Sequence, residues 1–423
     1  MLPVFKGLAA FVFYYPLFMS MIWMVGGVLF YWRRERMAEA EPTPGPDSPL
    51  VSILIPAYNE EQTIEETVLR HQNLNYPNYE IIVINDGSKD RTAQILQSLM
   101  TRNLNLRVVN LLRNGGKANA LYAGLAAARG EYLVTIDSDA TLDRNALYYL
   151  IQHFIAPNSG ERVGAVTGNP RVRNRSTLLA RIQVVEFASI IGMIKRAQRI
   201  WGKVMTVSGV IVAFRKRALM DCGLWDKDLI TDDIGVTWKL QRRFWDVRYE
   251  PRAICWMLVP ETFRGLWRQR VRWAQGGLEV LLRHWDVLLD WRQRRLIPIY
   301  LEQWMSVIWS FAWIIATVLM LFGVVLDERF IPGLWPGVYL SIICVIQFAL
   351  AMVIESRYER EITRYYLWAA WYGIAYWYLN VAYIVAALPK ALRSKRAAHA
   401  VWDSPDRGLG ERRANRGAKA EAT

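Results

Sequence analysis

The stretch "LVSILIPAYN", residues 50–59, is a short apolar run rich in β-branched side chains that ends in polar residues, and "YEIIVIND", residues 79–86, repeats the pattern. Two further runs of this kind follow at 106–112 and 131–139. Such continuous apolar runs are typical of strands buried on both faces of a parallel sheet. Helical patterns such as residues 60–74 separate the runs. This alternation predicts a doubly wound, Rossmann-like α/β domain.

The residues that end these runs are unusually polar, and they are Tyr58 and Glu60, then Asp86, then Asp137 and Asp139. In a doubly wound sheet the ligand lies beyond the carboxyl ends of the strands. Converging carboxylates repel one another, so we expect a cation, and hard oxygen ligands favour Mg²⁺ or Mn²⁺. Turn or helix-cap chemistry explains one such aspartate equally well. Three together favour a functional site.

Two later patterns add charged residues at predicted helix starts. The sequence "NGGK", residues 114–117, places Lys117 after two glycines, where backbone amides and an ammonium suit a phosphate. A solvated lysine explains this pattern about as well. Asp232 and Asp233 begin another helical pattern, and a carboxylate there can serve as a general base. By composition alone, helix capping explains that pair better.

Apolar residues make up 53% of the 423-residue chain and gather in blocks. Four blocks have about the length that a bilayer-crossing helix needs, namely 8–32, 297–326, 334–354 and 366–388. The first block is followed by the basic residues Arg33, Arg34 and Arg36 and lacks a small-residue cleavage site, which indicates an uncleaved anchor with the amino terminus outside. The basic carboxyl-terminal tail should also prefer the cytosol, which conflicts with three further crossings.

The formal net charge of +14 lies largely beside the membrane blocks, so we expect anionic lipid and a phosphorylated substrate as partners, and no nucleic acid. The three cysteines form no CxxC pair, which argues against a zinc site or a disulfide framework. We expect six segments: an anchor at 1–36, a Pro-rich linker at 37–49, an α/β domain at 50–262, an interfacial region at 263–296, about three transmembrane helices at 297–390 and a basic tail at 391–423.

The segment "FRGLWRQRVRWAQGGLEVLLRHW", residues 263–285, interleaves arginines with tryptophans in one amphipathic helical pattern. Arg264, Arg268 and Arg270 are typical of a helix that lies in the membrane interface with its basic face toward lipid headgroups. A second amphipathic pattern covers residues 178–201 and predicts another interfacial helix, although a core helix fits nearly as well.

The motifs "PAYNE", "NDGS", "NGGKANAL", "DSD", "TDD" and "QRVRW" follow one another between residues 51 and 277. This series resembles that of the processive, membrane-embedded family-two glycosyltransferases, the group with the cellulose, chitin and hyaluronan synthases. The resemblance implies a GT-A-type fold for the α/β domain, a cytoplasmic catalytic site, and interfacial and transmembrane helices beside it.

Position by position, the resemblance implies that Tyr58, Glu60, Asp86 and Lys117 belong to the nucleotide pocket, with Asp86 near the uridine. It also implies a divalent ion, Mg²⁺ or Mn²⁺, held on the diphosphate of a UDP-sugar by Asp139, with Asp137 close by.

For the chemistry, the resemblance implies that Asp233 is the general base. This chain has Asp232 where the family motif has Glu, so both aspartates stay open as the base. Gln269, Arg272 and Trp273 match the Gln-x-x-Arg-Trp motif. There Arg272 would offset charge on the leaving UDP, and Trp273 would support the acceptor sugar.

Within the family, "RVRWAQGG" and the tail "VWDSPDRG" are most similar to the bacterial synthases of poly-β-1,6-N-acetylglucosamine, a biofilm exopolysaccharide. This implies an inverting polymerase of the bacterial inner membrane that exports its glycan as it grows. A small membrane accessory subunit and cyclic di-GMP are common partners of such synthases. The alternatives are another processive β-glycan synthase of cellulose, chitin or hyaluronan type, or a lipid-phosphate sugar transferase.

Overall fold

The computed structural model describes residues 2–37, 43–326, 336–369 and 371–394. These residues form two compact units. We call them the sheet unit, with residues 43–180 and 204–269, and the helical unit, with the described residues of 2–37, 181–203 and 270–394. Residues 181–203, expected inside the α/β domain, thus belong to the helical unit, and the expected domain boundaries stay a prediction.

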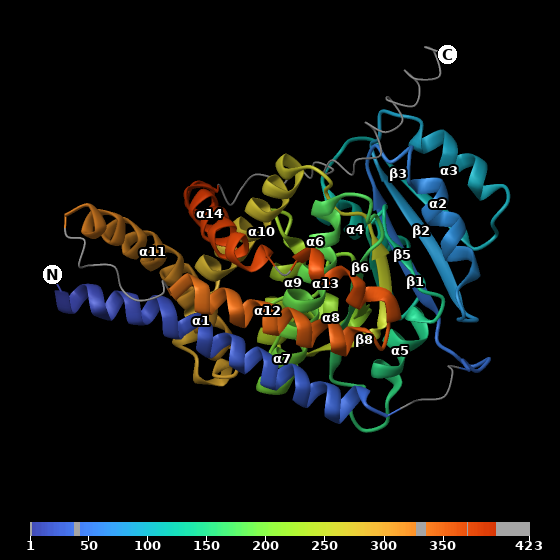
Figure 1. The fold of residues 1–423 in the computed structure, drawn as a ribbon. Helices are drawn as coiled ribbons and strands as arrows, with labels where there is room; N and C mark the ends of the chain where they lie inside the picture. Colours follow the sequence, from blue (N-terminus) through green and yellow to red (C-terminus); the bar gives the residue numbers. More distant parts are fainter. Residues whose placement is uncertain (1, 38–42, 327–335, 370, 395–423) are drawn as a thin grey trace, which may run out of the picture. The chain divides into compact units, whose positions relative to one another are not determined.

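One eight-stranded sheet forms the centre of the sheet unit, with strand order β3-β2-β1-β4-β7-β6-β8-β5 (Figure 1). The strands are β1 Val51–Ala57, β2 Tyr79–Asp86, β3 Leu106–Leu111, β4 Tyr132–Ile136, β5 Thr141–Leu142, β6 Val163–Val172, β7 Ile211–Arg215 and β8 Asp246–Met257. Neighbours within β3-β2-β1-β4 are parallel, whereas β7 is antiparallel to both β4 and β6. The α/β expectation is therefore confirmed, with a Rossmann-like first half and a mixed second half.

Burial explains the apolar runs of the sequence. Every residue of β4, and every residue of β1 except Pro56, is buried, because both strands lie inside the sheet and have neighbours on both sides. The edge strand β3 buries fully only Leu106. The chain runs from β1 to β2 and β3 and then returns to β4 on the other side of β1. The strand order thus reverses between β1 and β4, where sheets of this type bind ligands.

Helices of the sheet unit follow the strands. They are α2 Ile64–Arg70, α3 Thr92–Met100, α4 Lys117–Ala127, α5 Ala146–Ile155, α8 Lys216–Asp221 and α9 Asp232–Arg242, with a 3₁₀ turn η2 at His71–Asn73. Helix α4 packs on β1, β2 and β3. Helix α9 has acidic residues in its first turn and basic residues in its last, as the helix dipole favours. Both predicted helix starts, at Lys117 and at Asp232, are confirmed.

The helical unit contains long helices joined by short turns. Its elements are α1 Leu2–Phe30, η1 Tyr31–Glu35, η3 Phe187–Met193, α7 Ile194–Trp201, η4 Trp285–Leu288, η5 Trp291–Gln293, α11 Ile297–Leu326, α12 Pro336–Glu355, η7 Arg360–Tyr365, α13 Tyr366–Ala369 and α14 Tyr372–Arg393. The unit boundaries fall inside α6 Leu178–Glu186 and α10 Phe263–Arg283. The helix predicted from residue 263 is confirmed, and residues 178–201 are helical throughout, with a π-helical centre.

Three helices in the described part of the chain are long and apolar enough to cross a membrane, namely Gly7–Glu35, Ile297–Leu319 and Val338–Glu355. They coincide with three of the four predicted blocks. The fourth block, 366–388, includes α13 and most of α14 among its described residues, and neither helix is among these candidate spans. The number of crossings therefore stays a prediction, and the basic tail after 394 lies outside the described residues.

Exposed apolar side chains mark the surface of the first candidate span. Tyr14, Phe18, Met21 and Val25 of α1 are each more than half exposed and recur every three or four residues. They form one apolar stripe along the helix. A stripe of this kind is costly in water, so we expect lipid or a partner helix to cover it.

Candidate active site

A small crevice opens at the carboxyl ends of β1 and β4, where the strand order reverses. It is lined by Pro56, Ala57, Tyr58, Asp86, Asn114, Gly116, Lys117, Ala120, Asp137 and Ser138. Four residues expected at the site, Tyr58, Asp86, Lys117 and Asp137, therefore do share one cleft.

Lys117 is the first residue of α4 and the centre of this site. Its Nζ donates to Asp137 Oδ1 at 2.6 Å and to the carbonyl oxygen of Gly209 at 3.2 Å. Burial alone would lower the pKa of Lys117, but the carboxylates of Asp137, Asp232 and Asp233 outweigh it and raise this pKa above its usual value. Three carboxylates thus surround one ammonium, and the site has surplus negative charge.

Asp233 joins the same hydrogen-bonded chain through the backbone of Gly209. The Gly209 amide donates to Asp233 Oδ2 at 3.2 Å, while the carbonyl of the same residue accepts from Lys117. A Cβ on residue 209 would lie 3.2 Å from that carboxylate oxygen, so glycine allows the close approach. Burial and repulsion from Asp232 raise the pKa of Asp233 to about 6. A carboxylate that titrates near 6 can accept a proton at neutral pH better than an ordinary aspartate can.

Asp86 also lines the crevice, and its carboxylate binds the loop that contains Gly115 and Gly116. Its Oδ1 accepts from the Gly115 amide at 3.0 Å, and its Oδ2 accepts from the Gly116 amide at 2.9 Å. Gly116 has φ +84°, a conformation that side chains disfavour. Burial raises the pKa of Asp86, and these two hydrogen bonds oppose the rise. Asp86 thereby positions the loop that leads directly into Lys117.

The two carboxylates expected to hold a metal ion come from the turn after β4. Asp139 is buried, and Asp137 is paired with Lys117. Both lie close enough to the Cys255 thiol to raise its pKa, after burial, well above the usual value. Among the described residues, no cluster of three or more His, Cys, Asp or Glu could hold an ion alone. Two hard carboxylates fit the mode in which Mg²⁺ is held jointly by protein and substrate phosphates.

Other expected site residues lie in different surroundings. Glu60 is buried, and its Oε2 accepts from Thr63 Oγ1 at 2.8 Å, so its carboxylate is occupied within its own turn. Gln269 is buried with no hydrogen-bond partner for Oε1 among the described residues. Arg272 and Trp273 belong to the helical unit, so their roles stay predictions.

Two polar residues that line the crevice were not predicted from the sequence. The hydroxyl of Ser138 is buried without a hydrogen-bond partner in the described part of the chain, and Asn114 lines the same crevice. Their signal was their position, since Ser138 lies between the two aspartates of "DSD" and Asn114 precedes the two glycines. A buried orphan hydroxyl is costly unless a ligand or water satisfies it.

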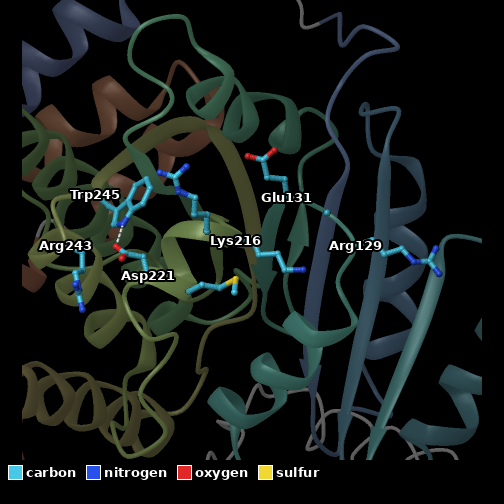
Figure 2. Close-up of a pocket in the computed structure, with 9 residues that line it drawn as sticks. Arg129, Glu131, Lys216, Asp221, Arg243 and Trp245 are labelled. Carbon is cyan, nitrogen blue, oxygen red and sulfur yellow. Dashed lines mark hydrogen bonds between the residues drawn. The ribbon is translucent and has the colours of Figure 1, made fainter.

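A second cavity, of about 810 Å³, opens beside the amino end of β4 and the carboxyl end of β7 (Figure 2). Its lining includes Lys216, Asp221 and Trp245, whose Nε1 donates to Asp221 Oδ2 at 2.8 Å. Its lining contains neither Lys117 nor any of the aspartates near Lys117. Size alone would therefore select the wrong end of the strands, and the smaller crevice holds the converging ionisable groups.

Comparison with known proteins shows the family to which this chain belongs. Residues 52–223 match the family described as Glycosyl transferase family 2. A poly-β-1,6-N-acetyl-D-glucosamine synthase of Staphylococcus epidermidis is 41% identical over 412 residues, which cover 94% of this chain and 98% of the relative. The chain belongs to the poly-β-1,6-N-acetyl-D-glucosamine synthase family.

Another member of this synthase family, from Staphylococcus aureus, is 42% identical over 416 residues, which cover 95% of this chain and 99% of the relative. Among solved structures, a mannosyltransferase from Pyrobaculum calidifontis, in complex with GDP-Man and Mn²⁺, matches with a TM-score of 0.60. It covers 91% of this chain and 99% of its own at 20% identity, and it therefore supports the fold alone. The synthase family membership and the GT-A-type α/β fold expected from the motifs are confirmed.

Proposed function

We propose that this protein polymerises N-acetylglucosamine from UDP-N-acetylglucosamine into poly-β-1,6-N-acetylglucosamine for a biofilm matrix. The relationship to synthases of that name over almost the whole chain supports this product rather than a cellulose, chitin or hyaluronan type of glycan. The same relatives disfavour a lipid-phosphate sugar transferase. The observation that carries the enzymatic proposal is the continuous chain from Asp137 through Lys117 and Gly209 to Asp233.

In this proposal, Asp233 is the general base. It accepts the proton of the acceptor hydroxyl, whose oxygen attacks the anomeric carbon from the face opposite the leaving UDP, so the configuration inverts. Its raised pKa and its fixed orientation by the Gly209 amide support this choice over Asp232. Lys117 lowers the pKa of Asp233 and keeps part of the population ionised.

The donor is bound in the crevice after β1, β2 and β4. Tyr58, Asp86 and Lys117 line the crevice in which we place the nucleotide, and Glu60 supports the turn behind it. The amides of Gly115 and Gly116, expected from the sequence to face a phosphate, donate to Asp86 instead. We assign Asp139 and Asp137 as the protein ligands of a divalent ion, Mg²⁺ or Mn²⁺, which would neutralise charge on the diphosphate when bound. Chelation followed by addition of each ion to membranes, with UDP release as the readout, tests this assignment.

The motif on α10 completes the proposed machinery. Arg272 stabilises the departing UDP, because a guanidinium keeps its charge and matches a diphosphate geometrically. Trp273 supports the acceptor sugar, and Gln269, whose buried Oε1 has no partner among the described residues, belongs to the same substrate-binding motif. Arg272 makes no hydrogen bond or ion pair with the residues that the structure describes, which leaves its guanidinium available for an anion.

We place the protein in the bacterial inner membrane as a multi-pass protein with a cytoplasmic sheet unit. The candidate spans and the basic residues Arg33, Arg34 and Arg36 support this orientation. A small membrane accessory subunit and cyclic di-GMP complete the proposed partners, beside UDP-sugar, glycan and lipid.

The decisive experiment uses membranes that contain the full chain. They are incubated separately with labelled UDP-N-acetylglucosamine, UDP-glucose and UDP-glucuronic acid, and the product is digested with linkage-specific hydrolases. We expect polymer from UDP-N-acetylglucosamine alone, and we expect a β-1,6-specific hydrolase to degrade it. Polymer from another donor, or resistance to that hydrolase, contradicts the proposed product.

A further inference from the structure

Two arginines of α10, two positions apart, have opposite surroundings. Arg270 is buried, and its Nη2 donates to Glu186 Oε2 at 2.8 Å, with 9% of each side chain exposed. Arg272 is half-buried and makes no such bond among the described residues. The sequence predicts that Arg270, like Arg264 and Arg268, faces lipid headgroups. That prediction is wrong for Arg270, because a carboxylate 84 positions earlier in the chain binds it.

The guanidinium of Arg270 lies over the indole of Trp273. The guanidinium carbon is 4.3 Å from the centroid of that ring, a close cation–π distance. Residues three apart on a helix share a face, so the helix itself brings this pair together. Phe187 adds a second contact to Trp273: the centroids of the two rings are 6.4 Å apart, and the ring planes meet at 60°. The indole is thus held by a cation on its face and by an aromatic neighbour.

The carboxylate of Glu186 stabilises the buried guanidinium of Arg270. A buried guanidinium needs a carboxylate partner, since an unpaired buried charge is strongly destabilising. The Nε of Arg270 has no hydrogen-bond partner among the described residues, so the ion pair through Nη2 carries the electrostatic compensation. Glu186 also immediately precedes Phe187, so one turn of chain supplies both the carboxylate and the aromatic ring.

We propose that Glu186 and Arg270 are positioning residues for the acceptor sugar, because they fix the orientation of the Trp273 indole. Trp273 is half-buried, so part of its ring is free to contact a sugar ring. Glu186 binds Arg270, and the Arg270 guanidinium stacks on Trp273, so both charged residues act through the indole in this proposal. The inference rests on the proposed function and extends the acceptor site beyond the Gln-x-x-Arg-Trp motif, to a residue on α6.

The test measures acceptor and donor separately. Membranes with the full chain receive UDP-N-acetylglucosamine and a short β-1,6-linked N-acetylglucosamine oligosaccharide. Arg270→Lys keeps the charge but loses the planar group that stacks on indole. We expect it to raise the acceptor KM about 10-fold, a loss on the scale of one cation–π contact, and to leave the donor KM within about 2-fold of wild type. The amount of UDP released per sugar incorporated should also rise.

Arg268→Lys is the matched control, since Arg268 lies on the same helix with an exposed side chain. It should leave both KM values unchanged. Glu186→Gln should reproduce the effect of Arg270→Lys. The double variant Glu186→Gln with Arg270→Gln leaves no unpaired buried charge, so it should fold even if a single variant does not, and it should still show the raised acceptor KM.

The outcomes separate this inference from the proposed function. If wild-type membranes make no polymer, the proposed function is wrong. If wild type makes polymer and Arg270→Lys matches Arg268→Lys, the positioning role alone is wrong. An equal rise in donor and acceptor KM, or a fall in kcat with both KM values unchanged, also overturns it, because either result indicates a general structural role.

Discussion

Charged side chains gather in both units, around Lys117 in the sheet unit and around Arg196 in the helical unit, and the two clusters differ in how fully they are satisfied. Arg196 binds Glu35 through Nε at 2.7 Å and Nη2 at 3.1 Å, and its Nη1 binds Glu355. No more than 2% of any of these three side chains is exposed. By contrast, Lys117 and Asp137 are 15% and 22% exposed.

The charged groups of the Arg196 cluster pair with one another. Its carboxylates come from η1 and α12, its guanidinium from α7, and the Tyr358 hydroxyl donates to Glu35 Oε2 at 2.6 Å. A closed arrangement of this kind joins three segments and leaves nothing for a ligand. In the Lys117 cluster, three carboxylates face one ammonium and the pKa of Asp233 is raised. Complete pairing indicates a structural role, whereas surplus charge with a shifted pKa indicates chemistry.

Asp233→Asn gives the largest expected effect. Loss of the proposed base should reduce polymer formation about 10³-fold. A raised pKa means that ionised Asp233 costs folding free energy at neutral pH, so the unfolding temperature should be equal or higher. Labelled sugar incorporation and thermal unfolding of the purified protein measure the two effects, with Asp232→Asn as the matched control. Retained synthesis in Asp233→Asn, with loss in Asp232→Asn, would reverse the assignment of the base.

Arg196→Met should have the opposite profile. It leaves Glu35 and Glu355 buried without their cation, and we expect a loss of about 3 kcal/mol in the free energy of unfolding. The unfolding temperature in detergent measures the loss. The triple variant with Glu35→Gln and Glu355→Gln should recover most of it. If Arg196→Met is as stable as wild type, the distinction between the two clusters fails.

The pH dependence of wild-type synthesis offers a smaller effect. Asp233 must be ionised to accept a proton, and its pKa is about 6, so the rate should fall as pH drops through that value. Between pH 7 and pH 5 the ionised fraction falls about 10-fold for such a group. Initial rates at saturating donor, in buffers of constant ionic strength, give the profile. An acid limb near pH 4 would mean that the base is an unperturbed carboxylate.

Lys117→Met sharpens the same profile. Lys117 lowers the pKa of Asp233, so its removal should raise that pKa and move the acid limb upward by about one pH unit. At pH 7 the loss of ionised base is about 2-fold, the smallest change considered. Lys239→Met is a suitable control, because that lysine pairs with Asp226, outside the crevice-lining residues. If the acid limb does not move, Lys117 has no electrostatic effect on the base.

The sequence alone was sufficient for the parts of the fold that depend on local pattern. Runs such as 50–59 predicted buried strands, and the glycines before Lys117 and the aspartate pair at 232–233 predicted helix starts, all of which are confirmed. It also placed Asp86 and Asp137 at one edge of the sheet. It did not give the direction of β7, because an apolar run shows burial and not strand polarity.

The contacts within the site were harder to predict from the sequence, since they join residues far apart in the chain. Lys117 was expected to bind phosphate, and no pattern indicated that it pairs with Asp137. Likewise, no local pattern indicated that the backbone of Gly209 joins Lys117 to Asp233. Arg270 had the same surroundings in sequence as its exposed neighbours.

What the sequence determined by itself is the succession of the first four strands, several helix starts and the apolar length of the candidate spans, because hydrophobic periodicity and capping act over a few neighbouring residues. Only the tertiary structure decided which charged side chains are fully paired with one another and which can still bind a ligand. Arg196 meets Glu35 and Glu355 across separations of 161 and 159 residues. Coulomb interactions and burial depend on distance in space, which no local pattern encodes.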